Sequence, residues 1–288
     1  MRPDPLVDPL ELAARLGEPG LRVLDSTVHL RRPAPGAPYS VQSGREDHEQ
    51  AHIPGALFAD LAGAMSDPDS PHPFSLPAPA RFAAAAGALG IGPGTHVVVY
   101  SQQSPMWATR LWWLLRYFGF DDVAVLDGGL RAWMAEGLPV ESGVQEPHAA
   151  EFTAQPRPEM AASLQEVAAL ASAGGPACLL NALSPQAFRG DGPGAYSRPG
   201  RIPGSVSMHW ELLVDPATGR FRPRSEIADT LGDLGAPGGP AVVAYCGGGI
   251  SATVDLFALE LIGRGGARLY DGSLTEWSAD PTLPMEVG

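Results

Sequence analysis

Cysteine is scarce in this chain, and positive charge is scarcer than negative charge. Only Cys178 and Cys246 occur among 288 residues, which is too few for a disulfide framework. Lysine and arginine total 19 against 32 aspartates and glutamates, so the formal net charge is −13. Because nucleic acids and anionic membrane surfaces select for basic clusters, the composition speaks against both as partners.

Long apolar runs are also missing. No uninterrupted apolar stretch approaches the roughly 20 residues that a membrane-spanning helix requires. Residues 1–6 lack the basic and then apolar arrangement of a secretory signal peptide. We therefore expect no membrane partner and a cytoplasmic location.

The residues that are present suit a folded protein of two domains. Apolar residues make up 44% of the chain and charged residues 18%, a balance typical of globular proteins rather than disordered ones. Glycine (35) and proline (30) are plentiful and predict many loops. The length allows two domains that each bury a core.

Three short motifs occur twice, in the same order and at nearly the same spacing. An order of elements retained over so long a distance indicates a duplicated domain. The three pairs are 52–55 with 201–204, 97–100 with 242–245, and 126–128 with 270–272.

Each half alternates short apolar runs with helical stretches. In the first half, apolar runs at 96–100 and 123–126 flank 107–118, whose aromatic and leucine residues suit a buried helix face. Such alternation predicts parallel strands with helices on both faces, and hence an α/β fold. The predicted parts are an N-terminal domain at 1–145, a linker rich in proline, glutamate and alanine at 146–158, and a C-terminal domain at 159–288.

The segment around Cys246 is the most informative. The apolar, β-branched run 241–245 predicts a strand, three glycines follow the cysteine, and the periodic apolar segment 253–262 predicts a helix. A thiol between a strand end and a helix N-terminus lies where backbone N–H groups converge, and that position favours an anion. We therefore interpret Cys246 as a reactive thiolate rather than a structural cysteine.

The two halves differ at this loop. Its counterpart in the first half, 100–108, has neither a cysteine nor a glycine run. We therefore expect one copy to be active and the other to serve as scaffold. Cys178, in contrast, lies inside the apolar run 177–180, where we expect a packed and inert side chain.

Together these segments are similar to those of a known family. The chain resembles the two-domain rhodanese-like sulfurtransferases, a group that includes thiosulfate sulfurtransferase and 3-mercaptopyruvate sulfurtransferase. The resemblance implies tandem duplicated rhodanese domains, each a parallel sheet with helices on both faces, of which only the C-terminal one carries the nucleophile. The matching segments are 51–56, 110–113, 126–129, 246–252 and 269–277.

The resemblance implies sulfur transfer by an enzyme that needs no metal or cofactor. The Cys246 thiolate would attack the outer sulfur of a small anionic donor, keep it as a persulfide, and pass it to a thiol or cyanide acceptor. The glycines would let N–H groups turn inward around the sulfur, and the Ser251 hydroxyl would cap the following helix. The residues whose backbone would form this cradle are Gly247, Gly248, Gly249, Ile250, Ser251 and Ala252.

Departures from the family pattern leave the donor open between thiosulfate, mercaptopyruvate and another compound. The neutral loop is closer to the mercaptopyruvate type, Cys-Gly-Ser-Gly-Val-Thr-Ala, although Gly248 replaces the serine. The family's donor-binding arginine is replaced by Ala187. The remaining candidate cations are Arg189, Arg198 and Arg201.

His52 allows two interpretations. It matches a first-domain histidine of the family, which implies a part in proton transfer at the domain interface. The simpler interpretation is a structural role in the turn that begins at Ile53. A metal site with His48, four residues earlier, is conceivable, but the following Ile-Pro pair favours a solvated helix end instead.

Three alternatives use the same loop. The run 247–252 satisfies the G-x-G-x-x-A pattern of a dinucleotide site, with Asp271 after a later strand, but its counterpart in the first half lacks the pattern. A cysteine phosphatase would need an arginine where Ala252 stands, six residues after Cys246. The third alternative is a persulfide relay, in which Cys246 accepts sulfur from a partner protein and passes it on.

Overall fold

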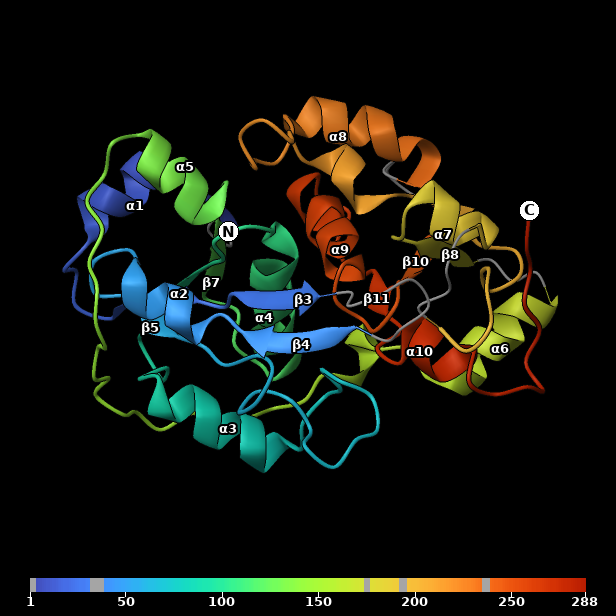
Figure 1. Cartoon of the computed structure of the whole chain (residues 1–288), viewed down its shortest axis with the longest axis horizontal. Helices are drawn as coiled ribbons and strands as arrows, with labels where there is room; N and C mark the ends of the chain where they lie inside the picture. Colours follow the sequence, from blue (N-terminus) through green and yellow to red (C-terminus); the bar gives the residue numbers. More distant parts are fainter. Residues whose placement is uncertain (1–3, 32–38, 174–176, 192–195, 235–238) are drawn as a thin grey trace.

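Two parallel sheets, one in each half of the chain, form the framework of the protein (Figure 1). The computed structural model describes residues 4–31, 39–173, 177–191, 196–234 and 239–288. Among these residues, every helix is too short or too polar to cross a lipid bilayer.

The N-terminal sheet has the strand order β1-β7-β6-β2-β5, with every pair parallel. Side chains alternate along its central strand, so Val98 packs with Trp133 on one face and Val97 with Trp113 on the other. Helices α1 (Pro9–Arg15) and α5 (Gly129–Ala135) cover the first face, and α3 (Pro79–Ala88) and α4 (Pro105–Tyr117) the second. The strands are β1 (Leu6–Val7), β2 (Leu21–Asp25), β5 (Leu57–Phe58), β6 (His96–Tyr100) and β7 (Val123–Leu126).

Two further elements of the N-terminal domain lie outside this sheet. A small antiparallel hairpin joins β3 (Val28–Arg31) to β4 (Ser40–Ser43). The short helix α2 (Arg45–Gln50) follows the hairpin and leads into the Ile-Pro-Gly turn.

The C-terminal sheet repeats the arrangement with the order β11-β10-β8-β9, again with every pair parallel. Val243 packs with Trp277 on the face covered by α6 (Leu164–Ala173) and α10 (Ser273–Trp277). Val242 packs with Leu259 on the face covered by α8 (Arg224–Leu231) and α9 (Ala252–Leu261). The other elements are β8 (Ala177–Asn181), α7 (Pro185–Arg189), β9 (Val206–Ser207), β10 (Ala241–Tyr245), β11 (Arg268–Leu269), η1 (Pro158–Met160), η2 (Trp210–Leu213) and η3 (Gly232–Leu234).

The domains share hydrogen bonds as well as topology. Each has a buried tyrosine at the end of its central strand, and its hydroxyl accepts the amide of the isoleucine in the Ile-Pro-Gly turn. Tyr100 accepts from Ile53 at 3.2 Å, and Tyr245 accepts from Ile202 at 3.1 Å. The predicted duplicated α/β architecture, with helices on both faces of each sheet, is confirmed.

Helix α4 of the N-terminal domain packs against α9 of the C-terminal domain at the centre of the molecule (Figure 1). The hydroxyls of Thr109 and Thr253 lie 2.8 Å apart, and the rings of Trp112 and Phe257 meet edge to face at 4.9 Å. One core cluster contains residues of both helices. The helix that follows the Cys246 loop therefore rests on the other domain.

Residues 146–157 contain neither helix nor strand and run along the N-terminal domain. The Ala150 amide donates to the Gly87 carbonyl at 2.9 Å, and the Gln155 amide to the Phe118 carbonyl at 2.9 Å. The two sheets lie on either side of the predicted linker, 146–158. The limits of the two domains, 1–145 and 159–288, stay predictions.

Candidate active site

Cys246 is the first residue after β10, the strand that lies between β8 and β11. The residue is only 2% exposed. Residues 247–251 connect it to the N-terminus of α9. The thiol is thus placed between the carboxyl end of a strand and the positive end of a helix, where a negative charge is stabilised.

The N-terminus of α10 holds this loop in place. The Ser273 hydroxyl accepts hydrogen bonds from the backbone amides of Cys246 and Gly249, each at 3.1 Å. Thr275 donates twice to the Gly247 carbonyl, from its amide at 2.8 Å and from its hydroxyl at 2.6 Å. Neither Ser273 nor Thr275 could be assigned a role from the sequence, because their partners lie almost thirty residues earlier in the chain.

Two of the three glycines are required by the space around them. Gly249 has a φ of +73°, and a Cβ there would lie 2.7 Å from the Asp271 carbonyl oxygen. A Cβ on Gly247 would lie 2.1 Å from the Tyr196 hydroxyl oxygen. Gly248 is different, because a Cβ there would meet nothing closer than 3.7 Å.

Several loop amides have no acceptor among the residues that the structure describes. This set excludes Gly249, whose amide is bound by Ser273. The Ser251 hydroxyl makes no capping hydrogen bond to α9, so the expected cap is wrong. The remaining amides are those of Gly247, Gly248, Ile250, Ser251 and Ala252, and their part in the predicted cradle stays a prediction.

Arg110 reaches from α4 to the Cys246 loop. The side chain is 1% exposed, and its guanidinium donates to the Gly249 carbonyl at 3.1 Å and pairs with Asp271 at 2.7 Å. It also donates to the Phe74 carbonyl at 2.6 Å, and the Leu76 amide donates to the Asp271 carboxylate at 3.0 Å. The N-terminal domain therefore fixes one carbonyl of the loop that carries the thiol.

The three candidate arginines for donor binding differ in what they bind. Arg198 donates to four backbone carbonyls near the end of the chain. Arg201 donates to two backbone carbonyls and pairs with Glu286. Arg189 pairs with Asp191 at 2.7 Å and is more exposed. None of the three contacts the Cys246 loop in the described part of the chain, so their role in donor binding stays a prediction.

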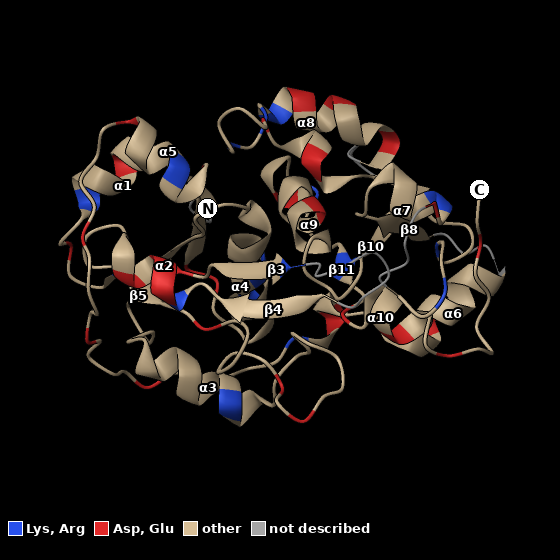
Figure 2. Ribbon diagram, viewed as in Figure 1, with Lys and Arg blue, Asp and Glu red and all other residues tan. Residues whose placement is uncertain are grey.

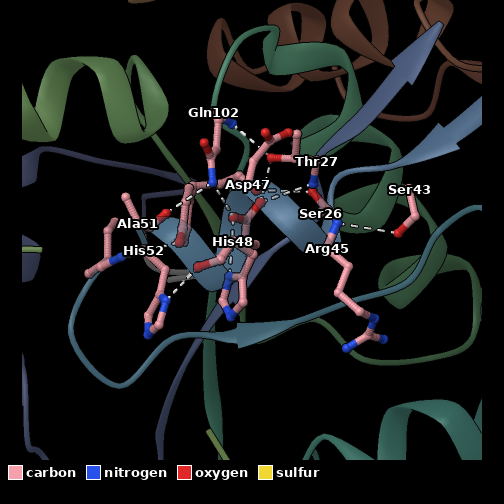
Figure 3. Close-up of polar contacts among 12 residues, drawn as sticks. Ser26, Thr27, Ser43, Arg45, Asp47, His48, Ala51, His52 and Gln102 are labelled. Atoms are coloured by element: carbon pink, nitrogen blue, oxygen red, sulfur yellow. Dashed lines mark hydrogen bonds and ion pairs between the residues drawn. The ribbon is translucent and has the colours of Figure 1, made fainter. Parts of the chain in front are cut away.

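His52 lies in the N-terminal domain, beside the carboxyl ends of β2 and β6. Its ring stacks on His48 with centroids 4.3 Å apart, and its Nδ1 donates to the His48 carbonyl at 2.7 Å. His48 Nδ1 lies 3.3 Å from the Asp25 carboxylate, to which the Gln102 side-chain amide donates at 3.1 Å (Figure 3). Both histidines are buried, so the solvated helix end expected here is wrong. A part for His52 in proton transfer stays a prediction.

Asp255 is a second buried group that sequence reasoning missed. It lies in α9, it is fully buried, and neither carboxylate oxygen has a hydrogen-bond partner in the described protein. Burial, and then the negative charge of Cys246, raise the pKa of this carboxyl well above its usual range. The available signal was a single acid in an otherwise apolar run from Thr253 to Leu259.

Cys178 lies in β8 and is half-buried. Burial raises the pKa of its thiol, so this group stays protonated at neutral pH. No cluster of three or more histidine, cysteine, aspartate or glutamate side chains is arranged to hold a metal ion within the described ranges.

Acidic side chains outnumber basic ones on the protein. Acidic side chains are spread over helices of both domains, including α1, α2 and α8, and basic side chains are fewer (Figure 2). The chain contains no lysine, so arginine is its only permanently cationic side chain. An anionic donor would therefore depend on arginines, loop amides and the end of α9 for its binding.

The family model of the rhodanese-like domain matches this chain twice, at residues 8–136 and 163–280. The first match covers every strand of the N-terminal sheet except β1, and the second covers all four strands of the C-terminal sheet. The chain therefore belongs to the rhodanese family, as a two-domain member whose second domain carries the loop cysteine.

Relatives that match nearly the whole chain are sulfurtransferases. The chain is 38% identical over 290 residues to the probable 3-mercaptopyruvate sulfurtransferase of Pseudomonas aeruginosa, covering 96% of each protein. It is 34% identical over 290 residues to the putative thiosulfate sulfurtransferase SseB of Mycobacterium tuberculosis, covering 98% of this chain and 97% of that one. The crystal structure of SseA from Escherichia coli, which shows the rhodanese fold of the 3-mercaptopyruvate enzymes, matches with a TM-score of 0.80 at 30% identity, over 94% of this chain and 99% of that one. The protein is a rhodanese-family sulfurtransferase.

Proposed function

We propose that this protein moves a sulfane sulfur from a small anionic donor, 3-mercaptopyruvate in preference to thiosulfate, to a nucleophilic acceptor through a persulfide on Cys246. The observation that carries the proposal is the position of this thiol, at the end of β10 and the start of α9, among loop amides that have no acceptor in the described protein. Such amides and the helix end are suited to hold a negative sulfur.

The reaction has two steps. The Cys246 thiolate attacks the donor's sulfur, an S–S bond forms, and the bond between that sulfur and the donor's carbon breaks. The carbon keeps the electron pair and takes up the proton of the donor's thiol, which leaves pyruvate and the persulfide anion. An acceptor thiol or cyanide then attacks the outer sulfur and removes it, which returns the thiolate.

The loop supports mercaptopyruvate as the preferred donor because residues 247–252 carry no charged side chain. Among the proposed donor-binding cations, Arg189 has the most accessible side chain, and it pairs with Asp191 at the surface of the described structure. Arg198 and Arg201 would have to release backbone carbonyls before binding a donor. We expect Arg189 to contribute most to donor binding, and buried His52 to act at most indirectly.

The proposal is tested by steady-state kinetics with 3-mercaptopyruvate and with thiosulfate, followed by mass spectrometry of the protein. We expect sulfur transfer to cyanide and to thiols, a higher kcat/KM for mercaptopyruvate, and one added sulfur atom on Cys246. Cys246→Ser should abolish both the transfer and the added sulfur, whereas Cys178→Ala should retain them. Substantial transfer by Cys246→Ser would contradict the assignment.

The persulfide relay makes a different prediction for the same experiment. If neither small donor gives a persulfide, but a partner protein that carries a persulfide does, then the relay is the function and the small-molecule enzyme is not. The 2% exposure of Cys246 favours a small donor, because a partner's sulfur would have to reach a buried thiol. The acceptor and a cytoplasmic location stay predictions from the sequence.

A further inference from the structure

Ser273 adopts a backbone conformation that a residue with a side chain usually avoids. Its φ is +49°, in the left-handed region that favours glycine. The residue is fully buried at the start of α10. A strained residue is retained when the surrounding structure or its function depends on it. The question is therefore what the side chain of Ser273 provides.

The N-terminal domain has glycine at the equivalent position. Gly129 has a φ of +57°, and a Cβ there would lie 2.2 Å from the Ser101 carbonyl oxygen. The backbone contact is shared: the Leu130 amide donates to the Ser101 carbonyl, and the Leu274 amide to the Cys246 carbonyl, each at 3.2 Å. The copy with the thiol thus carries a serine where the copy without it carries the unstrained residue.

The Ser273 hydroxyl uses its full hydrogen-bonding capacity. A hydroxyl has one hydrogen to donate and two lone pairs. Ser273 donates to the Tyr270 carbonyl at 2.8 Å and accepts from the amides of Cys246 and Gly249 at 3.1 Å each. Because these two amides lie on either side of Gly247 and Gly248, one oxygen atom fixes both ends of the turn that begins at the thiol.

The two amides that donate to Ser273 are not available to bind the sulfur. The amides of Gly247, Gly248 and Ile250, which have no acceptor among the described residues, are left for an anion at the thiol. Without the hydroxyl, the Cys246 and Gly249 amides would be buried without an acceptor, and the loop would have to rearrange to satisfy them.

We propose that Ser273 is a positioning residue for sulfur transfer, whose hydroxyl fixes the curvature of the Cys246–Gly249 turn and so directs the other loop amides at the sulfur. Its catalytic meaning rests on the proposed persulfide chemistry. Ser273 does not touch the donor and takes no proton from it. The strained backbone is accepted because only a residue with a Cβ can carry the hydroxyl to this position.

Two substitutions separate the hydroxyl from the strain. Ser273→Gly removes both, whereas Ser273→Ala removes the hydroxyl and keeps the strain. Both should be made with Cys178→Ala, so that Cys246 is the only thiol. The first readout is the rate of alkylation of Cys246 by iodoacetamide as a function of pH, which needs no sulfur donor. The second is the split between kcat and KM with 3-mercaptopyruvate, and the third is the melting temperature.

We expect both variants to slow alkylation at neutral pH and to lower kcat by about tenfold to a hundredfold, because two buried amides lose their acceptor. The KM should change little, because Ser273 does not bind the donor. Ser273→Gly should melt no lower than Ser273→Ala, since glycine adopts a positive φ without strain. Ser278→Ala is the matched control: it removes a buried hydroxyl that accepts the Ser197 amide at 3.1 Å, away from the loop, and should leave alkylation unchanged.

The outcomes that would overturn the proposal are specific. Alkylation and kcat at the unsubstituted level in Ser273→Gly would show that the hydroxyl positions nothing. A loss in Ser273→Ala alone would assign the whole effect to backbone strain. If the unsubstituted protein turns over neither small donor, the proposed function fails, but the alkylation profiles still decide whether Ser273 sets the reactivity of Cys246.

Discussion

The loop after β6 in the N-terminal domain and the loop after β10 in the C-terminal domain begin from the same framework. In the first, side chains fill the space. The Gln102 side-chain amide donates to the Asp25 carboxylate and the Ala51 carbonyl, each at 3.1 Å. The backbone amide of Gln102 donates to the Thr27 hydroxyl at 2.9 Å. The Ser101 hydroxyl donates to another residue of its own loop. Polar side chains thus bind this loop to neighbouring segments of the N-terminal domain, although the Ser104 hydroxyl is buried without a partner in the described protein.

The second loop is the reverse. Glycines stand in place of the polar side chains. Ser273, which lies outside the loop, accepts the amides of Cys246 and Gly249, and other loop amides have no acceptor among the described residues. Opposite the loop, Asn181 ends β8 as Asp25 ends β2, and its Nδ2 is buried without a partner in the described protein. The comparison teaches that the two loops differ as much in the side chains that the second one lacks as in the thiol that it carries.

The helices after the two loops differ in the same way. Each carries one fully buried charged residue, Arg110 in α4 and Asp255 in α9. Arg110 has a carboxylate and two carbonyls as partners, whereas Asp255 has none among the described residues. Three substitutions test these contrasts.

The largest effect should come from filling the open loop. Gly249→Ala places a Cβ 2.7 Å from the Asp271 carbonyl oxygen at a φ of +73°, so the loop must shift. We expect sulfur transfer to fall by about a hundredfold or more, because a displacement of this size is enough to misplace the thiol. Gly248→Ala is the matched variant, with nothing closer than 3.7 Å, and should lose less than about tenfold. Equal losses in kcat/KM would show that the space around Gly249 is not what matters.

A smaller effect, on stability, should follow from removing the paired charge. Arg110→Met leaves Asp271 and two carbonyls without their buried donor, and should lower the free energy of unfolding by about 3 kcal/mol. Arg116→Met, on the same helix, loses more exposed ion pairs with Asp121 and Glu260 and should cost about 1 kcal/mol or less. Denaturant unfolding of both variants measures the difference. A similar loss of unfolding free energy in the two variants would show that Arg110 does not stabilise the contact between the domains.

The smallest effect should be a gain in stability, from removing the unpaired carboxyl group of Asp255. A carboxyl whose pKa is raised on folding destabilises the fold once the pH exceeds its unfolded value of about 3.9, and the penalty grows as the pH rises toward the folded pKa. Asp255→Asn should therefore raise the free energy of unfolding by roughly 1 kcal/mol at pH 8 and by much less at pH 4. An equal gain at both pH values would show that ionisation of Asp255 is not the cause.

Much of this architecture could be predicted from the sequence, because it depends on local patterns. The apolar run 241–245 ends at Cys246, and the glycines after it predict a loop rather than a longer strand, so the thiol's place at a strand end followed directly. The family resemblance and the missing cysteine in the first copy predict that the C-terminal domain is the active one, and this stays a prediction. The two family matches confirm the duplication.

What the sequence could not predict depends on contacts between distant residues. From the sequence alone, Arg198 and Arg201 are candidates for donor binding. The fold shows that both donate to backbone carbonyls near the end of the chain. His52 resembles a surface histidine until the neighbouring strands bury it. Ser273 is identified by a positive φ and by two amides more than twenty residues away, neither of which leaves a local pattern.

The hydrogen bond from Arg110 to the Gly249 carbonyl gives the first domain a part in holding the Cys246 loop. This contact spans the two domains, so the N-terminal copy supports the Cys246 loop although it lacks the cysteine itself. The loop after Tyr100 makes no such contact with the other domain in the described structure, whereas α4 supplies the side chain that holds the Gly249 carbonyl. Substitutions along the surface where α4 meets α9 should therefore alter the rate of sulfur transfer, although they lie far from the thiol.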